Sequence, residues 1–447
     1  MHIEKLRMQN FRGFKDVTID FPSNLAVFIG VNGSGKSSII DCCALFLSLL
    51  VTSVRMFRDF HDSEPPSISE SDITIGYDET QNQIDVLLDL KRLSFPLILT
   101  RKSSREMNLF TRINTSESIK EGEKVIFHNE SYYGLDSVFS EVVNDFYQIL
   151  TNKLSDENIY DGFPILVHYS TDRAVNEIVL DSDQKNLNIP ALAYDYAITK
   201  KVDFTDFFVW YRNQEDLENE VRLSDNPNYV DHKLKTIRSA IPLFLPKLSN
   251  LRVKRSMPIR MTMMKDGDEL NIKQLSSGEK NLLVMVADIA RRLAIANPDP
   301  TKNALEGEGI ILIDEIELHL HPQWQRDIIP RLTSTFPNCQ FIVTTHSPQV
   351  LSNVKKENVF VVEDFQVYPA DAYTFGRDSN SILSELMGVT ERPVEIQNKL
   401  TECLYKIDDG QIEEAKILLR ELSDLLGHND SEIVKANTLI SFLSKVK

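Results

Sequence analysis

The segment GVNGSGKS, which runs from Gly30 to Ser37, constrains the fold of this chain more than any other feature. It follows the apolar stretch LAVFIG and leads into SSIIDCCALFLSLL, so it joins a buried strand to a helix. The spacing G-x-x-x-x-G-K-S is typical of a loop that surrounds phosphate groups with backbone N–H groups. The strand–loop–helix context therefore predicts an α/β fold that binds a nucleoside triphosphate.

Each residue type in this loop has a chemical reason to be there. Glycine permits backbone conformations and close approaches that a side chain would obstruct, and the following helix adds its positive dipole end. We expect Lys36 to bridge the outer phosphates and the Ser37 hydroxyl to ligate Mg²⁺. The residues expected to bind ATP in this loop are Asn32, Gly33, Ser34, Gly35, Lys36, Ser37 and Ser38.

Two further motifs place acidic and imidazole side chains after apolar strands. IILIDE ends in Asp314 and Glu315, and VTTHS contains His346. We expect Asp314 to lie beside the magnesium ion and Glu315 to act as the general base that polarises the attacking water. His346 can hydrogen-bond the γ-phosphate or that water. Adjacent carboxylates also occur in ordinary turns, but the four aliphatic residues before them favour a catalytic role.

The fourth motif, LSSGE, has no strong chemical role at a nucleotide bound by its own subunit. Ser276 and Gly278 open a helix, beginning near Gly278, whose N–H groups can hold an anion. In a head-to-tail dimer, this helix would cap the γ-phosphate bound by the opposite subunit. The residues expected to do so are Ser276, Ser277, Gly278 and Glu279. If LSSGE stood alone, its serine would be interpreted as an ordinary N-cap without a further role. Together, the four motifs predict ATP-driven dimerisation.

Other candidates depend on weaker patterns. Arg12, in NFRGF, could reach the base or the phosphates, and Arg173, in HYSTDRA, could be a site arginine or a salt-bridge partner. His319 and His321 resemble metal ligands in spacing, but no third ligand is evident, which favours an interface loop. We identify no glutamine for the loop that usually senses magnesium.

Charge limits the classes of partner. The chain of 447 residues carries a formal net charge of −17, which argues against nucleic-acid binding through bulk positive charge. The segment 247–260 is a local exception, because it contains Arg252, Lys254 and Arg255. A solvated strand edge explains this segment more simply than DNA contact does.

The cysteines and the apolar segments indicate a cytoplasmic protein without a membrane contact. No cysteine pair has C-x-x-C spacing and two cysteines are adjacent, so neither a zinc site nor a disulfide framework is expected. The N-terminal residues MHIEKLRMQN do not form a signal peptide. The most apolar stretch, 39–51, carries Asp41 and is too short to span a bilayer.

The patterns divide the chain into four parts. We expect a first ATPase lobe at 1–137, a mostly helical insertion at 138–246, a second ATPase lobe at 247–365, and a helical C-terminal region at 366–447. The insertion has no sustained heptads, so at most a short helical hairpin protrudes there.

The expected elements follow from apolar periodicity and turn signals. Strands are predicted at 3–11, 15–21, 25–30, 72–77, 83–91, 95–102 and 164–170, and a hairpin turns at Asp266-Gly267. Helices are predicted at 138–154, at 203–245 with a break near 225–227, and at 395–407, 411–426 and 431–445. The strands IILIDE and QFIVTTH each precede a helix, which predicts parallel pairing with right-handed crossovers.

These motifs resemble the Rad50/RecF/SMC branch of ATP-binding-cassette proteins. The resemblance rests on NFRGF before the phosphate loop, LSSGE in place of LSGGQ, and IDEIELHLHP after the acidic strand, and it covers about two-thirds of the chain. The implied fold is a P-loop NTPase of the ABC type, with a short helical insertion and an α-helical C-terminal tail. The tail TFGRDSNSILSELMGVTERP is similar to tails in stand-alone ATPases of bacterial defence islands, such as PtuA of Septu systems and some retrons.

That resemblance implies an ATPase, dependent on ATP and Mg²⁺, that protects cells against phage. It implies a homodimer or higher even homo-oligomer that controls a small HNH nuclease, with DNA contact indirect or through the complex. One alternative is a RecF/Rad50-like repair ATPase that binds DNA directly. An OLD-type nuclease is disfavoured, because the tail of this chain has no paired acidic motif. A transporter ATPase is disfavoured because such proteins have no counterpart of the insertion and the tail.

Overall fold

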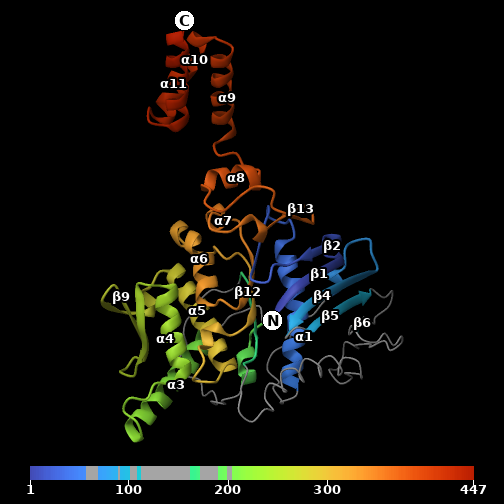
Figure 1. Ribbon diagram of the computed structural model, residues 1–447, viewed down its shortest axis with the longest axis vertical. Helices are drawn as coiled ribbons and strands as arrows, with labels where there is room; N and C mark the ends of the chain where they lie inside the picture. Colours follow the sequence, from blue (N-terminus) through green and yellow to red (C-terminus); the bar gives the residue numbers. More distant parts are fainter. Residues whose placement is uncertain are drawn as a thin grey trace. The chain divides into compact units, whose positions relative to one another are not determined.

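The computed structural model describes residues 1–56, 69–88, 91–100, 108–111, 162–171, 190–198 and 204–446. The predicted helix at 138–154 and the candidate Arg173 lie outside these residues. The described chain divides into two compact units, Met1–Gly376 and Arg377–Lys447, which are coloured from blue to red along the sequence in Figure 1. The predicted C-terminal region at 366–447 begins before this division, because β14 still belongs to the sheet of the first unit.

The main sheet of the first unit has six strands in the order β14-β13-β3-β12-β11-β7. The strands are β3 (Leu25–Ile29), β7 (Ile165–Tyr169), β11 (Gly309–Ile313), β12 (Cys339–Thr344), β13 (Val359–Glu363) and β14 (Gln366–Pro369). All neighbours pair in parallel except β13 and β14. Strands β3, β7, β11 and β12 are buried along their whole length, as parallel strands covered on both faces should be. The predicted α/β fold is confirmed.

A second sheet is antiparallel, with the order β2-β1-β4-β5-β6. Its strands are β1 (His2–Phe11), β2 (Phe14–Asp20), β4 (Glu79–Leu88), β5 (Lys91–Thr100) and β6 (Asn108–Thr111). Helix α1 (Lys36–Met56), this sheet and alternate residues of the main sheet share one apolar core. The core fixes α1, and with it the phosphate loop, between the two sheets.

The predicted strand at 72–77 is wrong. Residues Glu70–Asp72 form a short 3₁₀ helix, Ile73 makes an isolated bridge with Phe11, and Gly76 has φ +91° in the turn that follows. The alternation D-I-T-I-G-Y suggests a strand, but the Asp72 carboxylate accepts from the Ser69 backbone N–H and from Arg12. These bonds favour a turn over a ladder.

The predicted insertion at 138–246 is not a separate helical part. Strand β7 lies within it and pairs with β11 in the main sheet. The two predicted helices are present as α3 (Phe204–Ser224) and α4 (His232–Phe244), and α4 packs against α5 (Ser277–Ala296). The helix predicted near Gly278 is therefore confirmed as α5.

A small sheet, in the order β10-β9-β8, follows α4. Its strands are β8 (Leu248–Lys254), β9 (Arg260–Lys265) and β10 (Asp268–Asn271). Asp266 and Gly267 form the predicted hairpin turn, and both have positive φ, as a primed turn requires. Two helices follow β11 and β12, namely α6 (Pro322–Thr335) and α7 (Pro348–Leu351).

The second unit is helical and has its own small core. It contains α8 (Ser379–Met387), α9 (Val394–Asp408), α10 (Ile412–Leu426) and α11 (Ser431–Val446). The last three confirm the predicted helices, and Gly427 caps α10 with φ +89°. Helix α8 was not among the predicted helices, although Asp378 at its N-cap and Gly388 at its C-cap mark its ends. In the described part of the chain, every helix is too short or too polar to traverse a bilayer.

Candidate nucleotide site

The phosphate loop leaves β3 and ends where α1 begins at Lys36. The Lys36 side chain lies over the loop, and its Nζ donates hydrogen bonds to the carbonyl oxygens of Gly30 and Val31, both at 3.0 Å. Burial lowers the pKa of Lys36, while the nearby carboxylates of the acidic strand oppose that shift. The ammonium is therefore held by weak neutral acceptors that the oxygens of a phosphate can replace.

The backbone of the loop is too closely packed for larger residues. A Cβ on Gly30 would lie 2.1 Å from the Val362 carbonyl oxygen, and one on Gly35 would lie 2.6 Å from the Phe14 ring. Both glycines have positive φ. Gly33 has open space beside it, and the buried Ser34 hydroxyl has no hydrogen-bond partner. An unpaired buried donor fits a loop that completes its hydrogen bonds with a bound phosphate.

The acidic strand β11 places Asp314 and Glu315 at its end. The Thr344 hydroxyl donates to Asp314 Oδ1 at 2.5 Å and accepts from the Glu315 N–H at 2.7 Å, so one side chain positions both residues. Glu315 has φ +49°, a left-handed conformation that is costly for a residue with a side chain. Such strain persists where the surrounding structure imposes it, which is common at functional sites.

His346 follows β12, and Glu317 fixes the backbone at this position. The His346 N–H donates to Glu317 Oε1 at 2.6 Å, and the Thr345 hydroxyl donates to Glu317 Oε2 at 2.7 Å. Burial, and then the Lys36 charge, lower the pKa of His346. The imidazole is accordingly neutral near pH 7 and can accept a hydrogen bond as well as donate one.

The structure brings most of the predicted site together. Lys36, Asp314, Glu315 and Glu317 all contribute to the electrostatic environment of His346. These residues come from α1, from the loop after β11 and from the loop after β12. Thr344 and Glu317 were not assigned roles from the sequence. Their positions inside the motifs VTTHS and IDEIELHLHP were the only local signal.

The side chains at the mouth of the loop differ in exposure. Ser37 and Asn32 are exposed, and Ser38 accepts a hydrogen bond from Arg12 at 3.3 Å. The Arg12 guanidinium also bonds Asp41 at 2.7 Å and Asp72 at 2.9 Å. Burial lowers the pKa of Arg12, but these two carboxylates outweigh it and raise the pKa. Arg12 thus links α1 to the second sheet, and contact with a nucleotide stays a prediction.

The signature motif LSSGE forms the start of α5. Ser276 is its N-cap: the Glu279 N–H donates to Ser276 Oγ, and Glu279 Oε2 accepts from the Ser276 N–H at 3.0 Å. A Cβ on Gly278 would lie 2.6 Å from the His319 carbonyl oxygen, so the motif packs against the loop that follows the acidic strand. Ser276 and Ser277 are both exposed.

The two histidines of that loop have separate environments. His321 is the N-cap of α6, and its Nδ1 accepts from the Gln323 N–H at 3.3 Å. His319 has φ +64° and contributes the carbonyl next to Gly278. Across the described residues, no group of three or more potential metal ligands occurs, and that includes these histidines.

The signature helix is also connected to the acidic strand through Tyr169. The Asp314 N–H donates to the Tyr169 carbonyl oxygen at 2.9 Å, and the Tyr169 hydroxyl donates to Asp288 Oδ2 on α5 at 2.9 Å. Burial raises the pKa of Asp288, but Arg292 and Arg291 outweigh it and lower the pKa to about 2. Asp288 therefore stays charged, and this buried connection joins two motifs of the site.

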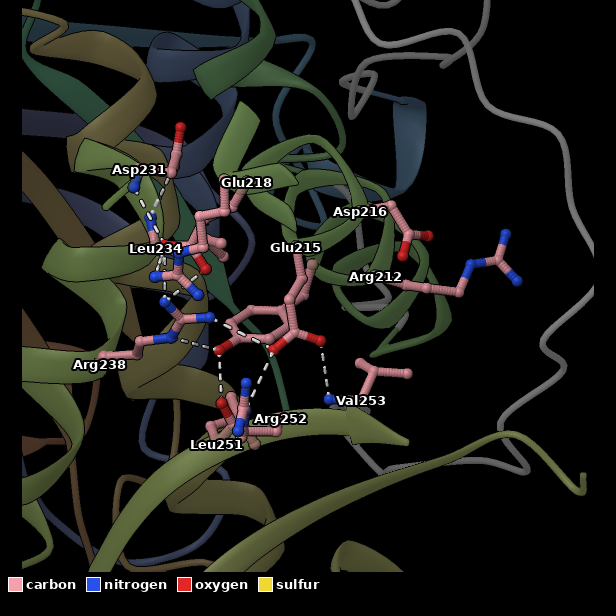
Figure 2. Close-up of polar contacts among 12 residues, drawn as sticks. Arg212, Glu215, Asp216, Glu218, Asp231, Leu234, Arg238, Leu251, Arg252 and Val253 are labelled. Carbon is pink, nitrogen blue, oxygen red and sulfur yellow. Dashed lines mark hydrogen bonds and ion pairs between the residues drawn. The ribbon is translucent and has the colours of Figure 1, made fainter. Parts of the chain in front are cut away.

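In the segment 247–260, the three basic residues singled out from the sequence are paired with acids. Figure 2 shows Arg252 beside Glu215 of α3, at 3.9 Å. Arg255 bonds Glu215 at 2.9 Å and Asp216 at 2.5 Å, and Lys254 bonds Glu269 at 3.0 Å. The acidic partners offset much of the local positive charge.

Of these acids, Glu215 also belongs to a larger junction between α3, α4 and β8 (Figure 2). Arg238 donates to both oxygens of Glu218 at 2.9 Å and to Glu215 at 3.3 Å. The Val253 N–H donates to Glu215 and the Asp231 N–H donates to Glu218, each at 3.0 Å. Buried charges are stable here because each has several partners.

The sequence matches one family model over most of its length. The model described as "AAA ATPase domain" matches residues 1–351, which include all four motifs. The chain belongs to the AAA ATPase domain family. It is an ATPase, as the sequence analysis predicted, and the family match agrees with the P-loop fold of the first unit.

Individual relatives in this comparison are ATPases of retrons, Septu proteins and RecF repair proteins. The Retron Ec83 probable ATPase of Escherichia coli is 29% identical, over 97% of this chain and 86% of its own length. Septu protein PtuA of Bacillus thuringiensis is 31% identical, over 31% of this chain and 42% of its own length. The DNA replication and repair protein RecF of Alkaliphilus oremlandii is 22% identical, over 82% of this chain and 100% of its own. The predicted resemblance to retron and PtuA ATPases is confirmed.

Proposed function

We propose that this ATPase is the nucleotide-driven subunit of a bacterial anti-phage defence complex, in which it dimerises through its heads and controls a small HNH nuclease. One observation carries the ATP-dependent part: Lys36, Asp314, Glu315 and His346 converge on one site. The defence part is supported by the Retron Ec83 relative, which spans nearly the whole chain.

Within the proposed site, each side chain has a separate task. Lys36 exchanges the carbonyl oxygens of Gly30 and Val31 for phosphate oxygens. Glu315 accepts a proton from the attacking water, and His346 orients that water or the terminal phosphate. Thr344 keeps Asp314 and Glu315 in their relative positions.

The residues present also fit a magnesium ion. Asp314 supplies a carboxylate and Ser37 an exposed hydroxyl, and both are oxygen ligands of the kind Mg²⁺ takes. When bound, the ion would neutralise charge on the outer phosphates. The unpaired Ser34 hydroxyl and the open side of Gly33 are consistent with phosphates in this position.

Dimerisation would complete the site from a second copy. The exposed N-terminus of α5 offers N–H groups and the Ser277 hydroxyl to a γ-phosphate on the opposite subunit. A diphosphate would leave these donors without a partner, so the closed dimer depends on ATP. In our proposal, this closed form restrains the nuclease, and nucleotide loss or infection releases it.

The test is native mass spectrometry on tagged protein purified from its own host, with and without ATP and magnesium. We expect an even number of these chains together with a small HNH protein, and nuclease activity that depends on ATP concentration. The variant Lys36→Ala should lose the ATP dependence while keeping the partner. Nuclease activity that ignores ATP in the reconstituted complex would disprove the proposed control.

The alternative is a RecF-like repair ATPase that grips DNA directly, and the RecF relative favours it. The pairing of Arg252, Lys254 and Arg255 with carboxylates counts against a basic DNA-binding surface at this segment. A chain that dimerises with ATP, carries no nuclease and binds duplex DNA in a salt-dependent manner would replace our proposal with this one.

A further inference from the structure

A cavity of about 430 Å³ lies beside the signature helix, apart from the phosphate loop. It is enclosed by the end of α4, the start of β8, the end of β9, the first turns of α5, and α6. Helix α5 begins at the signature motif, and α6 begins after the loop that follows the acidic strand. The cavity therefore touches helices that continue from two motifs of the nucleotide site.

The lining has the composition of a small-molecule site. Phe244, Leu248, Leu282 and Ile328 are buried and apolar, and half-buried Trp324 adds a flat aromatic face. The volume lies in the usual range for ligand pockets, roughly 300–1,000 Å³. A planar apolar body is the shape that such walls accommodate.

The charges of the lining favour an anion. Three cations, Lys247, Lys265 and Arg331, face two carboxylates, Glu279 and Asp327. Arg331 is already bonded to Asp327 at 3.1 Å and Lys265 to Glu279 at 2.6 Å. Lys247 has only a 3.8 Å pair with Asp266, and its side chain is 73% exposed. It remains accessible to an anionic group at the mouth of the cavity.

One contact connects the cavity to the nucleotide chemistry. Lys265 bonds one oxygen of Glu279, and the other oxygen accepts from the backbone N–H and the hydroxyl of Ser276. An anion bound at Lys265 competes with Glu279 for the ammonium. Glu279 then loses the ion pair that steadies its carboxylate beside Ser276, and the capping box at the start of the signature helix is weakened.

We propose that this cavity is an effector site for a small anionic ligand with a planar apolar body, and that occupancy weakens the ATP-dependent function of the signature motif. The effector role rests on the proposed function of the signature motif, whereas binding to the cavity is tested on the ATPase alone. Lys247 and Lys265 bind the anionic group, and Trp324 contacts the planar body.

The experiment uses anilinonaphthalene sulfonate as the probe, because it combines a planar aromatic body with one anionic group. We expect saturable fluorescence enhancement with the full-length protein, with energy transfer from Trp324. Trp324→Phe should remove that transfer, and Trp210→Phe should preserve it. Lys247→Glu should weaken binding by about tenfold, which corresponds to about 1.4 kcal/mol. Lys235→Glu, an exposed change on α4 outside the cavity lining, should leave binding unchanged.

The second measurement is ATP turnover at a saturating probe concentration. We expect turnover of the wild-type protein to fall at least about twofold, because the N-cap of the signature helix is weakened. Turnover of Lys247→Glu should be unaffected at the same probe concentration. Equal binding by Lys247→Glu and Lys235→Glu would place the probe elsewhere and overturn the site. Binding that depends on Lys247 but leaves turnover unchanged would overturn the effector role.

Discussion

The nucleotide site and the junction of α3, α4 and β8 are both rich in charged residues, yet they are built differently. At the junction, Glu215 and Glu218 are almost fully buried and every carboxylate oxygen has a partner within the same chain (Figure 2). At the nucleotide site, Lys36 is bonded to loop carbonyls, the Ser34 hydroxyl has no partner, and Glu315 has a strained backbone.

This difference separates a structural cluster from a functional one. A complete network of buried charges stabilises one arrangement of helices and has no capacity for a ligand. An incomplete, strained arrangement is tolerated only where something else completes it. The charges of the junction therefore predict effects on stability, and those of the nucleotide site predict effects on turnover.

The largest effect should come from Glu315→Gln. The change keeps the size of the side chain but removes the proton acceptor, so we expect kcat to fall by about 10²–10⁴-fold. ATP binding, measured with a fluorescent ATP analogue, should persist, and the free energy of unfolding should change little. The exposed Glu357→Gln is the matched control and should keep full turnover. A Glu315→Gln enzyme with undiminished kcat would remove Glu315 from the catalytic role.

Arg238→Met should lower the stability of the fold and leave ATP turnover largely unchanged. It leaves Glu218 buried without its main partner, and such a loss costs about 3–5 kcal/mol in the free energy of unfolding. Urea denaturation should detect it, and the folded fraction should still turn over ATP. The control, exposed Arg260→Met, should change stability by less than about 0.5 kcal/mol. A stable Arg238→Met protein with greatly reduced kcat would contradict the comparison.

Thr344→Val tests the hydroxyl that positions the acidic strand. Both hydrogen bonds, to Asp314 and from Glu315, are lost at nearly constant volume. Residues that hydrogen-bond a metal-binding or catalytic side chain contribute about 10–100-fold to activity or metal affinity. We expect a loss of about that size in kcat/KM. Thr335→Val is a close control, because Thr335 is also buried but its hydroxyl has no partner. Equal activity of the two variants would show that the Thr344 bonds are dispensable.

The smallest effect concerns Asp288 and pH. Its pKa is held at about 2, below the value of 3.8 in an unfolded chain, so its ionised form stabilises the fold above that unfolded value. This stabilisation is lost as the pH falls toward 2. Between about pH 6 and pH 3 the loss should be about 1 kcal/mol.

Asp288→Asn isolates this contribution. The variant should be less stable at neutral pH, and its free energy of unfolding should depend less on pH over the same interval. Asp371→Asn, a change at an exposed carboxylate, serves as the control for acid denaturation in general. An Asp288→Asn protein with the same pH dependence as the wild type would show that Asp288 does not titrate as the structure indicates.

Much of the fold could be predicted because it depends on short-range patterns. The phosphate loop, the Asp266-Gly267 turn and the last three helices follow from local spacing, and the structure confirms them. The strand predicted at 72–77 was wrong in part because the Asp72 side chain bonds Arg12, which lies close to it only after folding. Strand β7 was recognised as a strand, but its place beside β11 could not be derived from its own residues.

The sequence by itself determined how each motif folds locally, since a loop, a cap or a turn is specified by residues a few positions apart. It also predicted which chemical groups serve the nucleotide. Only the tertiary structure decided that Glu317 holds His346, that Tyr169 joins Asp314 to Asp288, and that a cavity lies beside the signature helix. These contacts connect residues far apart in the chain. They depend on strand order and helix packing, which no local pattern encodes.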